Sequence, residues 1–422
     1  MKKQSEFLKK VLKIIPLGTQ TFSRSKIFFD EKFSPLFNIK GKNQYLYDLN
    51  NIKYLDLISS LGAVSIGYSN NLINKEIIKT LKNGVTYSLA HPLEFEVSKL
   101  LVKHIPCAEM VRFGKNGTDA TSAAIRLSRF ITSRNKIAVC GYHGWQDWYI
   151  SSTTMNQGIP QYISKDIHAF EYNNLENLKK ILNKGKFAAI IMEPLSYTLP
   201  KNNFLKKVKV LAKEHGALLI FDEICTGFRV SLGGAQKLYK VIPDLATFGK
   251  GMANGFPLSA LVGKKKYMNQ ISKVFFSGTF GGETLSLSAC KQTIKFLIIN
   301  NTINKNILKG EKIKAILNAH LKKNNLENVL EFDGHPTWLF LKIKSSPKMK
   351  SSLIRAYIMQ EMSENNILFL GSINLQHSHT MKNINYIIKI FKKIFDKIQM
   401  NKENLKKITY YKIAKPLFKV RN

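Results

Sequence analysis

The sequence of 422 residues contains no long apolar run. Its apolar segments, such as residues 188–192 and 217–221, are much shorter than the roughly 20 residues that a helix needs to cross a bilayer. Near the N-terminus, Lys9, Lys10 and Lys13 interrupt any apolar core of the kind that a signal peptide requires. We therefore expect a cytoplasmic protein with no membrane partner.

Cysteine is also scarce, and its spacing fits neither a disulfide framework nor a metal site. The four cysteines are Cys107, Cys140, Cys225 and Cys290. We expect buried, reduced thiols and no bound metal. Cys225 lies within the most informative segment of the chain, but the sequence shows no base beside it that would activate a nucleophilic thiol.

Acidic residues are few: 28 Asp and Glu stand against 65 Lys and Arg, which gives a net charge of +37. Such an excess is compatible with nucleic-acid binding, and a basic binding protein without catalysis is one functional alternative. However, the lysines are dispersed among Asn and Ile, and no basic helix, zinc-finger spacing or RNA-binding aromatic motif accompanies them. We interpret the charge as solvated surface and expect no nucleic-acid partner. The most basic segment, residues 401–422, is predicted to be an exposed tail.

Between about residues 108 and 290, short apolar strands alternate with amphipathic helices. The predicted strands cover residues 137–140, 188–193, 218–222, 245–248 and 259–262. The predicted helices cover residues 119–130, 175–182, 204–215 and 283–299. This order predicts an α/β fold with a mostly parallel sheet covered by helices on both faces.

The flanking segments have a different pattern. Residues 5–15 predict a short helix that Pro16 ends, and residues 44–57 predict a hairpin. After about residue 300, three predicted helices and one strand indicate a smaller α+β domain. We therefore expect four parts: an N-terminal segment that packs with the small domain, a large domain, the small domain and a basic tail, over residues 1–60, 61–300, 301–400 and 401–422.

Two segments carry the chemistry: FDEICTGFR at residues 221–229 and DLATFGKGMANGFPLSALVG at residues 244–263. Asp222 follows the apolar run ALLIF and so ends a buried strand, at the sheet edge where open α/β folds bind ligands. Lys250 lies between two glycines after the next apolar run. Pyridoxal 5′-phosphate (PLP) needs a carboxylate to keep its pyridine nitrogen protonated and an amine to condense with its aldehyde. For Asp222 taken alone, a salt bridge at the strand end is the alternative.

The turn GKNGTDA at residues 114–120 precedes a predicted helix. Asn116, Gly117 and Thr118 would offer an amide, backbone N–H groups and a hydroxyl to a phosphate at the helix N-terminus. Simple capping of the helix by Thr118 or Asp119 is the alternative. The turn is neither a GxxxxGKS/T loop nor a GxGxxG motif.

Two other short segments are candidates for the same site. GYHGW places Tyr142 after a predicted strand, where its ring could stack on a flat cofactor or belong to the core. SGTFGGE places Thr279 in a turn of small residues before a helix, as a second candidate phosphate contact.

Taken together, these motifs resemble the class III PLP-dependent aminotransferases of fold type I. FGKNGTDATSAAIRLSR, GYHGWQDW, FDEICTGFR and PDLATFGKGMANGFPLSALVG occur in the family's order, and the resemblance covers about residues 10–400. Within the family the chain is most similar to the glutamate-1-semialdehyde 2,1-aminomutases. The resemblance implies a PLP enzyme with a large sheet domain and a small α+β domain, acting as a homodimer on small amino or aldehyde substrates.

The resemblance also implies roles for individual residues around the ring of the cofactor. Lys250 would be the Schiff-base lysine, and Asp222 would pair with the pyridine nitrogen. Ile224 would pack beneath the ring, and Tyr142 would stack above it.

Further roles concern the phosphate and the substrate. Gly117 and Thr118 would hold the phosphate, joined by Thr279 from the other subunit of a dimer. The segment PLGTQTFSRS resembles the family's N-terminal motif and places Arg24 where an arginine binds the substrate carboxylate.

Two reactions are consistent with these motifs. An aminomutase would move the amino group of glutamate-1-semialdehyde to the neighbouring carbon, whereas a transaminase would use a separate amino donor on another aldehyde or keto substrate, as in polysaccharide or secondary metabolism. The chain departs from the aminomutase pattern at Asn116, where serine is usual, and in the segments GYHGW and GTFGGET. The acidic gate residue usual near the C-terminus of aminomutases is also missing. The cofactor site is therefore predicted, while the substrate stays open between these two readings.

Overall fold

The computed structural model describes residues 2–346 and 349–412, which form two units. The large unit contains residues 71–303. The small unit combines the N-terminal residues, up to residue 70, with residues from 304 onward. Each unit has its own sheet structure and its own hydrophobic core.

The large unit is built on a seven-stranded sheet in the order β4-β10-β9-β8-β7-β5-β6. The strands are β4 (Met110–Gly114), β5 (Lys136–Cys140), β6 (Ile167–Ala169), β7 (Phe187–Met192), β8 (Leu218–Asp222), β9 (Leu245–Phe248) and β10 (Ser259–Gly263). Strands β5 to β9 pair in parallel, and only β10 runs antiparallel to its neighbours β4 and β9. The predicted, mostly parallel α/β sheet is confirmed.

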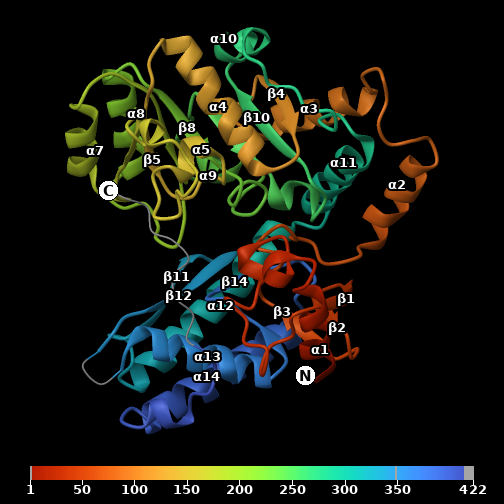
Figure 1. Ribbon diagram of the computed structural model, residues 1–422, viewed down its shortest axis with the longest axis vertical. Coiled ribbons are helices and arrows are strands. Elements are labelled where there is room, and N and C mark those ends of the chain that lie inside the picture. Colours follow the sequence, from red (N-terminus) through yellow and green to blue (C-terminus); the bar gives the residue numbers. More distant parts are fainter. Residues whose placement is uncertain (1, 347–348, 413–422) are drawn as a thin grey trace. The chain divides into compact units, whose positions relative to one another are not determined.

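The central strands are continuous apolar runs because helices cover the sheet on both faces. Every residue of β8 is buried. Leu218 and Ile220 belong to one core cluster together with apolar residues of α4 (Gly117–Thr132), and the alternating residues of β8 face the other side. Helix α4 crosses its face of the sheet and contacts β7, β9 and β10 (Figure 1).

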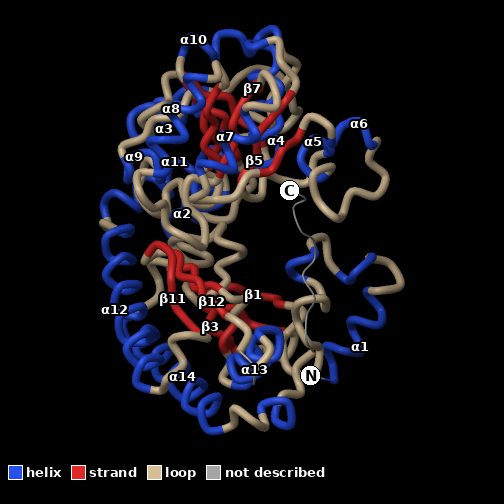
Figure 2. The backbone as a smooth tube through the Cα atoms, turned by 90° about the vertical axis from the view of Figure 1, so that its left-hand side faces the viewer, coloured by secondary structure: helices blue, strands red, loops and turns tan. Residues whose placement is uncertain are grey.

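The other helices of the large unit surround this sheet, and Figure 2 shows its red strands within a shell of blue helices. They are α2 (Asn71–Leu81), α3 (Pro92–His104), α5 (Asp147–Ile150), α6 (Gln161–Ser164), α7 (Leu175–Leu182), α8 (Phe204–Glu214), α9 (Gly234–Tyr239), α10 (Lys265–Met268) and α11 (Thr284–Ile299), with the 3-10 turns η3 (Lys250–Ala253) and η4 (Asn269–Lys273). The predicted helices of this region agree with the structure to within two residues at each end.

The small unit contains two small sheets. One has the order β1-β2-β3-β13 and the other the order β11-β12-β14. The strands are β1 (Asn38–Lys42), β2 (Tyr45–Asp48), β3 (Lys53–Asp56), β11 (Leu330–His335), β12 (Trp338–Ile343), β13 (Ile367–Leu368) and β14 (Ser372–Asn374). Because β13 pairs in parallel with β3, the N-terminal and C-terminal segments of the unit share one sheet.

Long amphipathic helices cover these strands. They are α1 (Lys2–Val11), α12 (Thr302–Lys323), α13 (Ser351–Glu364) and α14 (Met381–Met400), with the 3-10 turns η1 (Pro16–Gly18), η2 (Phe22–Arg24) and η5 (Leu405–Ile408). In α14 the buried apolar residues recur every three or four positions, so one face of the helix packs against the core. Among the residues that the structure describes, no helix combines the length and the apolar composition needed to span a membrane.

Residues 401–412 do not form the exposed tail that their basic composition predicted. Leu405 and Tyr411 are only 1% and 3% exposed. The Tyr411 hydroxyl accepts a hydrogen bond from the backbone N–H of Asp30 at 3.0 Å, which ties this segment to the N-terminal part of the small unit. The rest of the predicted tail, residues 413–422, lies outside the described residues.

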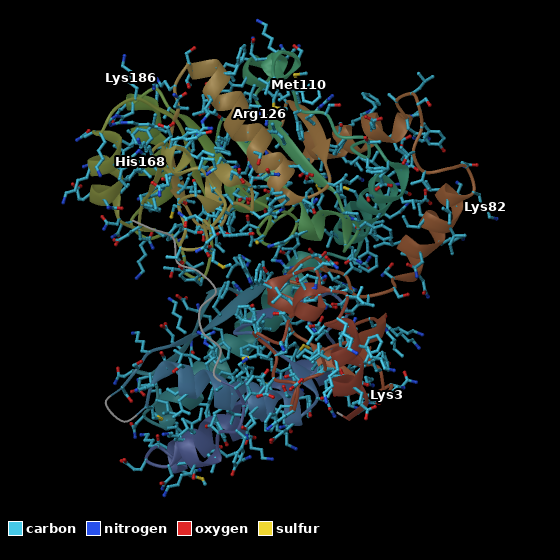
Figure 3. The ribbon with its side chains drawn as sticks, viewed as in Figure 1. Lys3, Lys82, Met110, Arg126, His168 and Lys186 are labelled. Atoms are coloured by element: carbon cyan, nitrogen blue, oxygen red, sulfur yellow. The ribbon has the colours of Figure 1, made fainter. Side chains whose placement is uncertain are left out.

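Basic side chains project into solvent at many places on the large unit. The labelled side chains of Lys82 and Lys186 extend away from the ribbon, and both residues are exposed (Figure 3). This arrangement agrees with the interpretation of the net charge as solvated surface.

One packing contact in the small unit can be tested directly. Gly310 lies in α12, and a Cβ at this position would lie 2.5 Å from the carbonyl carbon of Pro336. Because backbone atoms cannot yield as a flexible side chain does, we expect Gly310→Ala to destabilise the protein by about 1–3 kcal/mol, despite the better helix propensity of alanine. Thermal denaturation followed by circular dichroism measures this loss. The control is Gly278→Ala, where a Cβ has no neighbour within 4 Å; an equal or higher midpoint for Gly310→Ala would contradict the packing.

Candidate active site

The carboxyl ends of four parallel strands bring most of the predicted residues together. Tyr142 and His143 follow β5, Glu193 follows β7, Asp222 ends β8, and Lys250 follows β9. Parallel strands point the same way, so their carboxyl ends lie at one edge of the sheet, where open α/β folds bind ligands. Tyr142, Asp222 and Lys250 were predicted as site residues, whereas Glu193 and the role of His143 were not.

Asp222 is buried and held by three donors. Its Oδ1 accepts hydrogen bonds from the Thr247 hydroxyl at 3.1 Å and from the backbone N–H of Ile224 at 3.2 Å. Its Oδ2 lies 2.8 Å from Nδ1 of His143. With only 3% of the residue exposed, these contacts fix the carboxylate in one orientation. The partner is therefore a buried histidine of the same edge, so Asp222 takes part in an ion pair at the strand end, and its role toward a cofactor stays a prediction.

His143 connects Asp222 to α4. The ring is buried, and because Nδ1 faces a carboxylate, the hydrogen-bond network assigns the proton to Nδ1. The backbone carbonyl of His143 accepts a hydrogen bond from the Thr121 hydroxyl of α4 at 2.8 Å. Its Nε2 is buried without a hydrogen-bond partner among the described residues. The only signal in the sequence was its position in the glycine-bounded aromatic turn that follows the buried strand β5.

Glu223, next to Asp222, points away from this edge. Its carboxylate accepts hydrogen bonds from the backbone N–H groups of Ala235 at 2.7 Å and Gln236 at 2.8 Å, and from the Thr226 hydroxyl. Burial raises the pKa of Glu223 to about 7, although these hydrogen bonds act in the opposite direction. Glu223 therefore anchors the first turn of α9 and has a structural position.

Lys250 occupies a strained position beside a thiol. Its φ of 42° lies in the left-handed region, which is uncommon for a residue with a side chain and is often found at functional sites. Its Nζ lies 2.7 Å from Sγ of Cys225. Burial lowers the pKa of Lys250, but Cys225, Glu193 and Asp222 together outweigh burial and raise it above its ordinary value. In the cofactor-free protein the amine is therefore held as an ammonium group.

The glycine before Lys250 has only a weak steric role. A Cβ at Gly249 would meet its nearest neighbours only at 3.6 Å, an ordinary van der Waals distance. The positive φ belongs to Lys250 itself, since the φ of −179° at Gly249 is extended backbone. A glycine at position 249 is therefore not needed to avoid crowding around the Lys250 amine.

The N-terminus of α4 carries the predicted phosphate turn. The carboxylate of Asp119 accepts hydrogen bonds from the backbone N–H groups of Lys115 at 2.9 Å and Asn116 at 2.8 Å. A Cβ at Gly117 would lie 2.5 Å from Cδ1 of Ile224, so the glycine allows the turn to approach the segment that follows Asp222. The helix is thus capped by Asp119, and Thr118 is not needed for capping.

Thr118 has a buried hydroxyl that is left without a partner. The residue is 5% exposed, and its Oγ1 makes no hydrogen bond within the described part of the chain. The side chain packs against Gly144, where a Cβ would come within 2.6 Å of the Thr118 Cβ. A buried hydroxyl without a hydrogen bond is costly, so its position at a helix N-terminus points to a ligand oxygen.

Tyr142 lies at the exposed edge of this cluster, and two other predicted residues stand apart from it. Tyr142 is 49% exposed, and its ring meets Tyr149 edge-on at 5.7 Å. Thr279 lies in an exposed turn before α11 and makes no hydrogen bond to the cluster among the described residues. Arg24 belongs to the small unit, where Nη2 donates to the Ser60 hydroxyl at 3.2 Å and the side chain lines a cavity of about 400 Å³. The roles of Thr279 and Arg24 stay predictions.

Comparison with known proteins identifies the family. The sequence model of the family described as "Aminotransferase class-III" matches residues 29–371. The chain belongs to the class III aminotransferases. Among curated class III relatives, the 3-aminobutyryl-CoA aminotransferase of Cloacimonas acidaminovorans is 36% identical over 84% of this chain and 86% of its own length. The glutamate-1-semialdehyde 2,1-aminomutase of Wigglesworthia glossinidia brevipalpis is 35% identical over 90% of this chain and 96% of its own.

Solved structures confirm the fold of this class III aminotransferase. The FumI protein of Sphingopyxis sp. MTA144, solved with PLP, superposes with a TM-score of 0.88 at 21% identity and covers 98% of this chain and 99% of its own. At this level of identity the likeness establishes the fold type I architecture and not the substrate.

Class III aminotransferases use pyridoxal phosphate, and the residues of the site fit this cofactor. Lys250 would provide an amine for the aldehyde, and Asp222 would provide a buried carboxylate for the pyridine nitrogen. The unpartnered hydroxyl of Thr118 and the helix N-terminus behind it would provide donors for the phosphate. The chain is therefore an enzyme of the PLP-dependent class III type.

Replacing Thr118 tests whether its unpartnered hydroxyl binds a ligand, because the change should affect protein stability and PLP affinity in opposite directions. In the cofactor-free protein, Thr118→Val removes a buried polar group without a partner and keeps the volume, so stability should be unchanged or rise by about 1 kcal/mol. In the presence of cofactor, loss of one hydrogen bond to a charged phosphate should raise the Kd for PLP by roughly 10- to 100-fold. Denaturation of the cofactor-free protein and spectroscopic titration with PLP measure the two effects.

The matched control is Thr121→Val in the same helix turn. The Thr121 hydroxyl does have a partner, the His143 carbonyl, so its removal should lower the stability of the cofactor-free protein. If Thr118→Val is destabilised like Thr121→Val and binds PLP normally, the hydroxyl has no phosphate to bind.

Proposed function

We propose that this class III aminotransferase is a glutamate-1-semialdehyde 2,1-aminomutase that acts in the cytoplasm as a homodimer. The observation that carries the substrate assignment is the match to aminomutases along almost the whole chain. Besides the relative described above, two Thermosipho aminomutases are 34% and 33% identical over 92% and 93% of this chain. The dimer rests on the family resemblance, in which Thr279 would serve the site of the neighbouring copy.

The proposed roles follow from the contacts at the sheet edge. Bound PLP supplies an electron sink that stabilises negative charge on the substrate carbon next to nitrogen. Asp222, held by His143 and Thr247, keeps a proton on the pyridine nitrogen, which maintains that sink. Ile224 and Tyr142 would bound the two faces of the ring. Because these groups are fixed before the cofactor arrives, little reorganisation is needed for binding.

Lys250 is proposed to bind the cofactor's aldehyde carbon and, once released, to transfer protons. To take a proton from the substrate carbon, Nζ must be neutral. Burial favours the neutral amine, and in the cofactor-free protein the neighbouring Cys225, Glu193 and Asp222 oppose it. A positively charged ring nitrogen at Asp222 would weaken that opposition, so cofactor binding and activation of Lys250 are coupled.

The substrate and phosphate contacts complete the proposal. Gly117 and Thr118, with Asn116 before them, would hold the phosphate at the N-terminus of α4. Arg24 would bind the substrate carboxylate through its guanidinium group, which forms strong paired hydrogen bonds with carboxylates.

A second candidate is an aminotransferase that uses a separate amino donor. The 3-aminobutyryl-CoA aminotransferase is as similar to this chain as the aminomutases are, and this observation favours it. The missing acidic gate residue near the C-terminus points in the same direction. Both candidates share the residues around the cofactor, so those residues do not separate them.

Removal of the amine tests the cofactor assignment. Lys250→Ala should lower turnover by at least about a thousandfold, because it removes both the covalent attachment and the general base. Borohydride reduction followed by peptide mapping should label Lys250 in the wild type and nothing at that peptide in the variant. The control is Lys264→Ala, which removes a partly exposed lysine paired with Asp244 and should keep activity and labelling. Labelling at any other lysine would refute the assignment.

The amino donor separates the two candidates. An aminomutase returns the same nitrogen to its substrate, so the purified enzyme loaded with the amine form of the cofactor should convert glutamate-1-semialdehyde to 5-aminolevulinate over many turnovers without added donor. Product measured by chromatography should exceed the enzyme concentration by at least about tenfold. Product that stops at one equivalent and resumes only with added amino donor would replace the aminomutase by the second candidate.

A further inference from the structure

Residues 405–412 of the small unit pack onto α13, and we call them the C-terminal clasp. The side chain of Gln360 in α13 is buried and holds the clasp by its backbone. Its Oε1 accepts hydrogen bonds from the N–H groups of Tyr410 at 2.7 Å and Tyr411 at 3.1 Å. Its Nε2 donates to the carbonyl of Ile408 at 3.1 Å. One side of the clasp is therefore anchored to a helix of the core.

The other side of the clasp holds a stretch of the N-terminal chain. The Tyr411 hydroxyl donates to the carbonyl of Phe28 at 3.3 Å and accepts from the N–H of Asp30 at 3.0 Å. It also lies 2.9 Å from the Ser34 hydroxyl. The carboxylate of Asp30 accepts a hydrogen bond from the N–H of Lys412 at 2.6 Å. Because Tyr411 is buried, losing one of these bonds leaves a polar group unpaired, and the clasp fixes the stretch from Phe28 to Ser34.

This stretch forms part of the wall of the cavity of about 400 Å³ that contains Arg24. Phe29, which belongs to the stretch, and Pro35, which follows it, line the cavity together with Arg24. Turns connect the stretch to the arginine, because the N–H of Phe29 donates to the carbonyl of Ser25 at 3.2 Å. Ser25 is buried and directly follows Arg24. A displacement of the stretch would therefore move both the cavity wall and the turn that carries Arg24.

The charges of this cavity suit a carboxylate at Arg24. Within the described residues, Arg24 is the only basic side chain of the lining, and its one hydrogen bond is that of Nη2 to the Ser60 hydroxyl at 3.2 Å. A guanidinium group has five N–H donors, so most of them are available to a ligand. The two acidic residues of the lining, Asp48 and Asp56, are buried and already accept hydrogen bonds from other residues of the small unit.

We propose that the C-terminal clasp positions Arg24 and the cavity wall beside it, and so determines how tightly the enzyme binds the carboxylate end of its substrate. The inference rests on the proposed function, in which Arg24 binds that carboxylate. A guanidinium group binds a carboxylate through two parallel hydrogen bonds, which require a fixed orientation of the arginine. Tyr411 is in this sense a positioning residue, since it acts on the substrate through the stretch from Phe28 to Ser34.

The test compares two primary amines, 4-aminobutyrate and butylamine, which end in a carboxylate and a methyl group. Each is titrated into PLP-loaded enzyme while the absorbance of the cofactor is followed. The carboxylate preference is the Kd of butylamine divided by the Kd of 4-aminobutyrate. In the wild type it should be at least about tenfold, because a charge-assisted pair forms only with the carboxylate.

Two variants loosen the clasp from opposite sides. Tyr411→Phe removes the hydroxyl but keeps the ring, which packs near Phe33. Gln360→Met removes a side chain that hydrogen-bonds only to the clasp within the described residues. Each variant should lower the carboxylate preference at least about fivefold by weakening the binding of 4-aminobutyrate, while the Kd values of butylamine and PLP stay the same. A wild-type preference in both variants would refute the inference.

Two further variants control for a general loss of stability. Gly310→Ala should destabilise the same unit through its contact with Pro336, away from the clasp. Tyr410→Phe removes an exposed hydroxyl from the clasp itself, since Tyr410 is 70% exposed. Both should keep the wild-type preference. If Gly310→Ala lowers the preference as much as Tyr411→Phe does at an equal loss in Tm, the effect is general destabilisation and the inference is wrong.

Arg24→Met separates this inference from the proposed function. If Arg24→Met abolishes the carboxylate preference and both clasp variants keep it, the role of Arg24 stands and only the inference about the clasp fails. If the wild type shows no preference, or if Arg24→Met keeps it, the proposed role of Arg24 fails together with the inference that rests on it.

Discussion

The parallel pairing of β5, β7, β8 and β9 is the constraint on which the site depends. Because these strands run in one direction, the segments after them all emerge at the same edge of the sheet. Residues far apart in the chain, such as His143 and Asp222, can therefore lie 2.8 Å apart. The amphipathic helices on both faces bury the strands and leave only the strand ends open to ligands.

Much of the fold could be predicted because the core strands are unbroken apolar runs. Residues 218–222 and 245–248 were predicted with the bounds that β8 and β9 have in the structure. The short strands β6 and β13 were not predicted, since two or three residues carry no periodicity and pairing with a longer strand defines them. The prediction of an exposed tail was wrong at Leu405 and Tyr411 for a related reason: isolated apolar residues such as Tyr411 find partners only in the folded small unit.

The same distinction applies to the site. Asp222 and Lys250 could be predicted because each follows its own strand, and strand ends can be recognised along the chain. The place of Glu193 and the contact of His143 could not be predicted, because they depend on which strands are neighbours in the sheet. No local sequence pattern specifies that strand order. At Thr118 the sequence allowed two interpretations. The structure separates them, since Asp119 caps the helix and leaves the Thr118 hydroxyl without a partner.

Several carboxylates lie at this edge of the sheet although the protein as a whole is strongly basic. Glu223 is hydrogen-bonded by the N–H groups of α9, Asp222 pairs with His143, and Glu193 has a raised pKa. Burial prevents the surface lysines from screening these groups, so their negative potential acts on whatever binds between them. While the site lacks cofactor, burial lowers the pKa of Lys250, but Cys225, with Glu193 and Asp222, outweighs burial and raises it. With cofactor bound, the Asp222 carboxylate would favour a protonated pyridine nitrogen. In the proposed function the phosphate would lie instead at the N-terminus of α4, where backbone N–H groups and the helix dipole favour an anion.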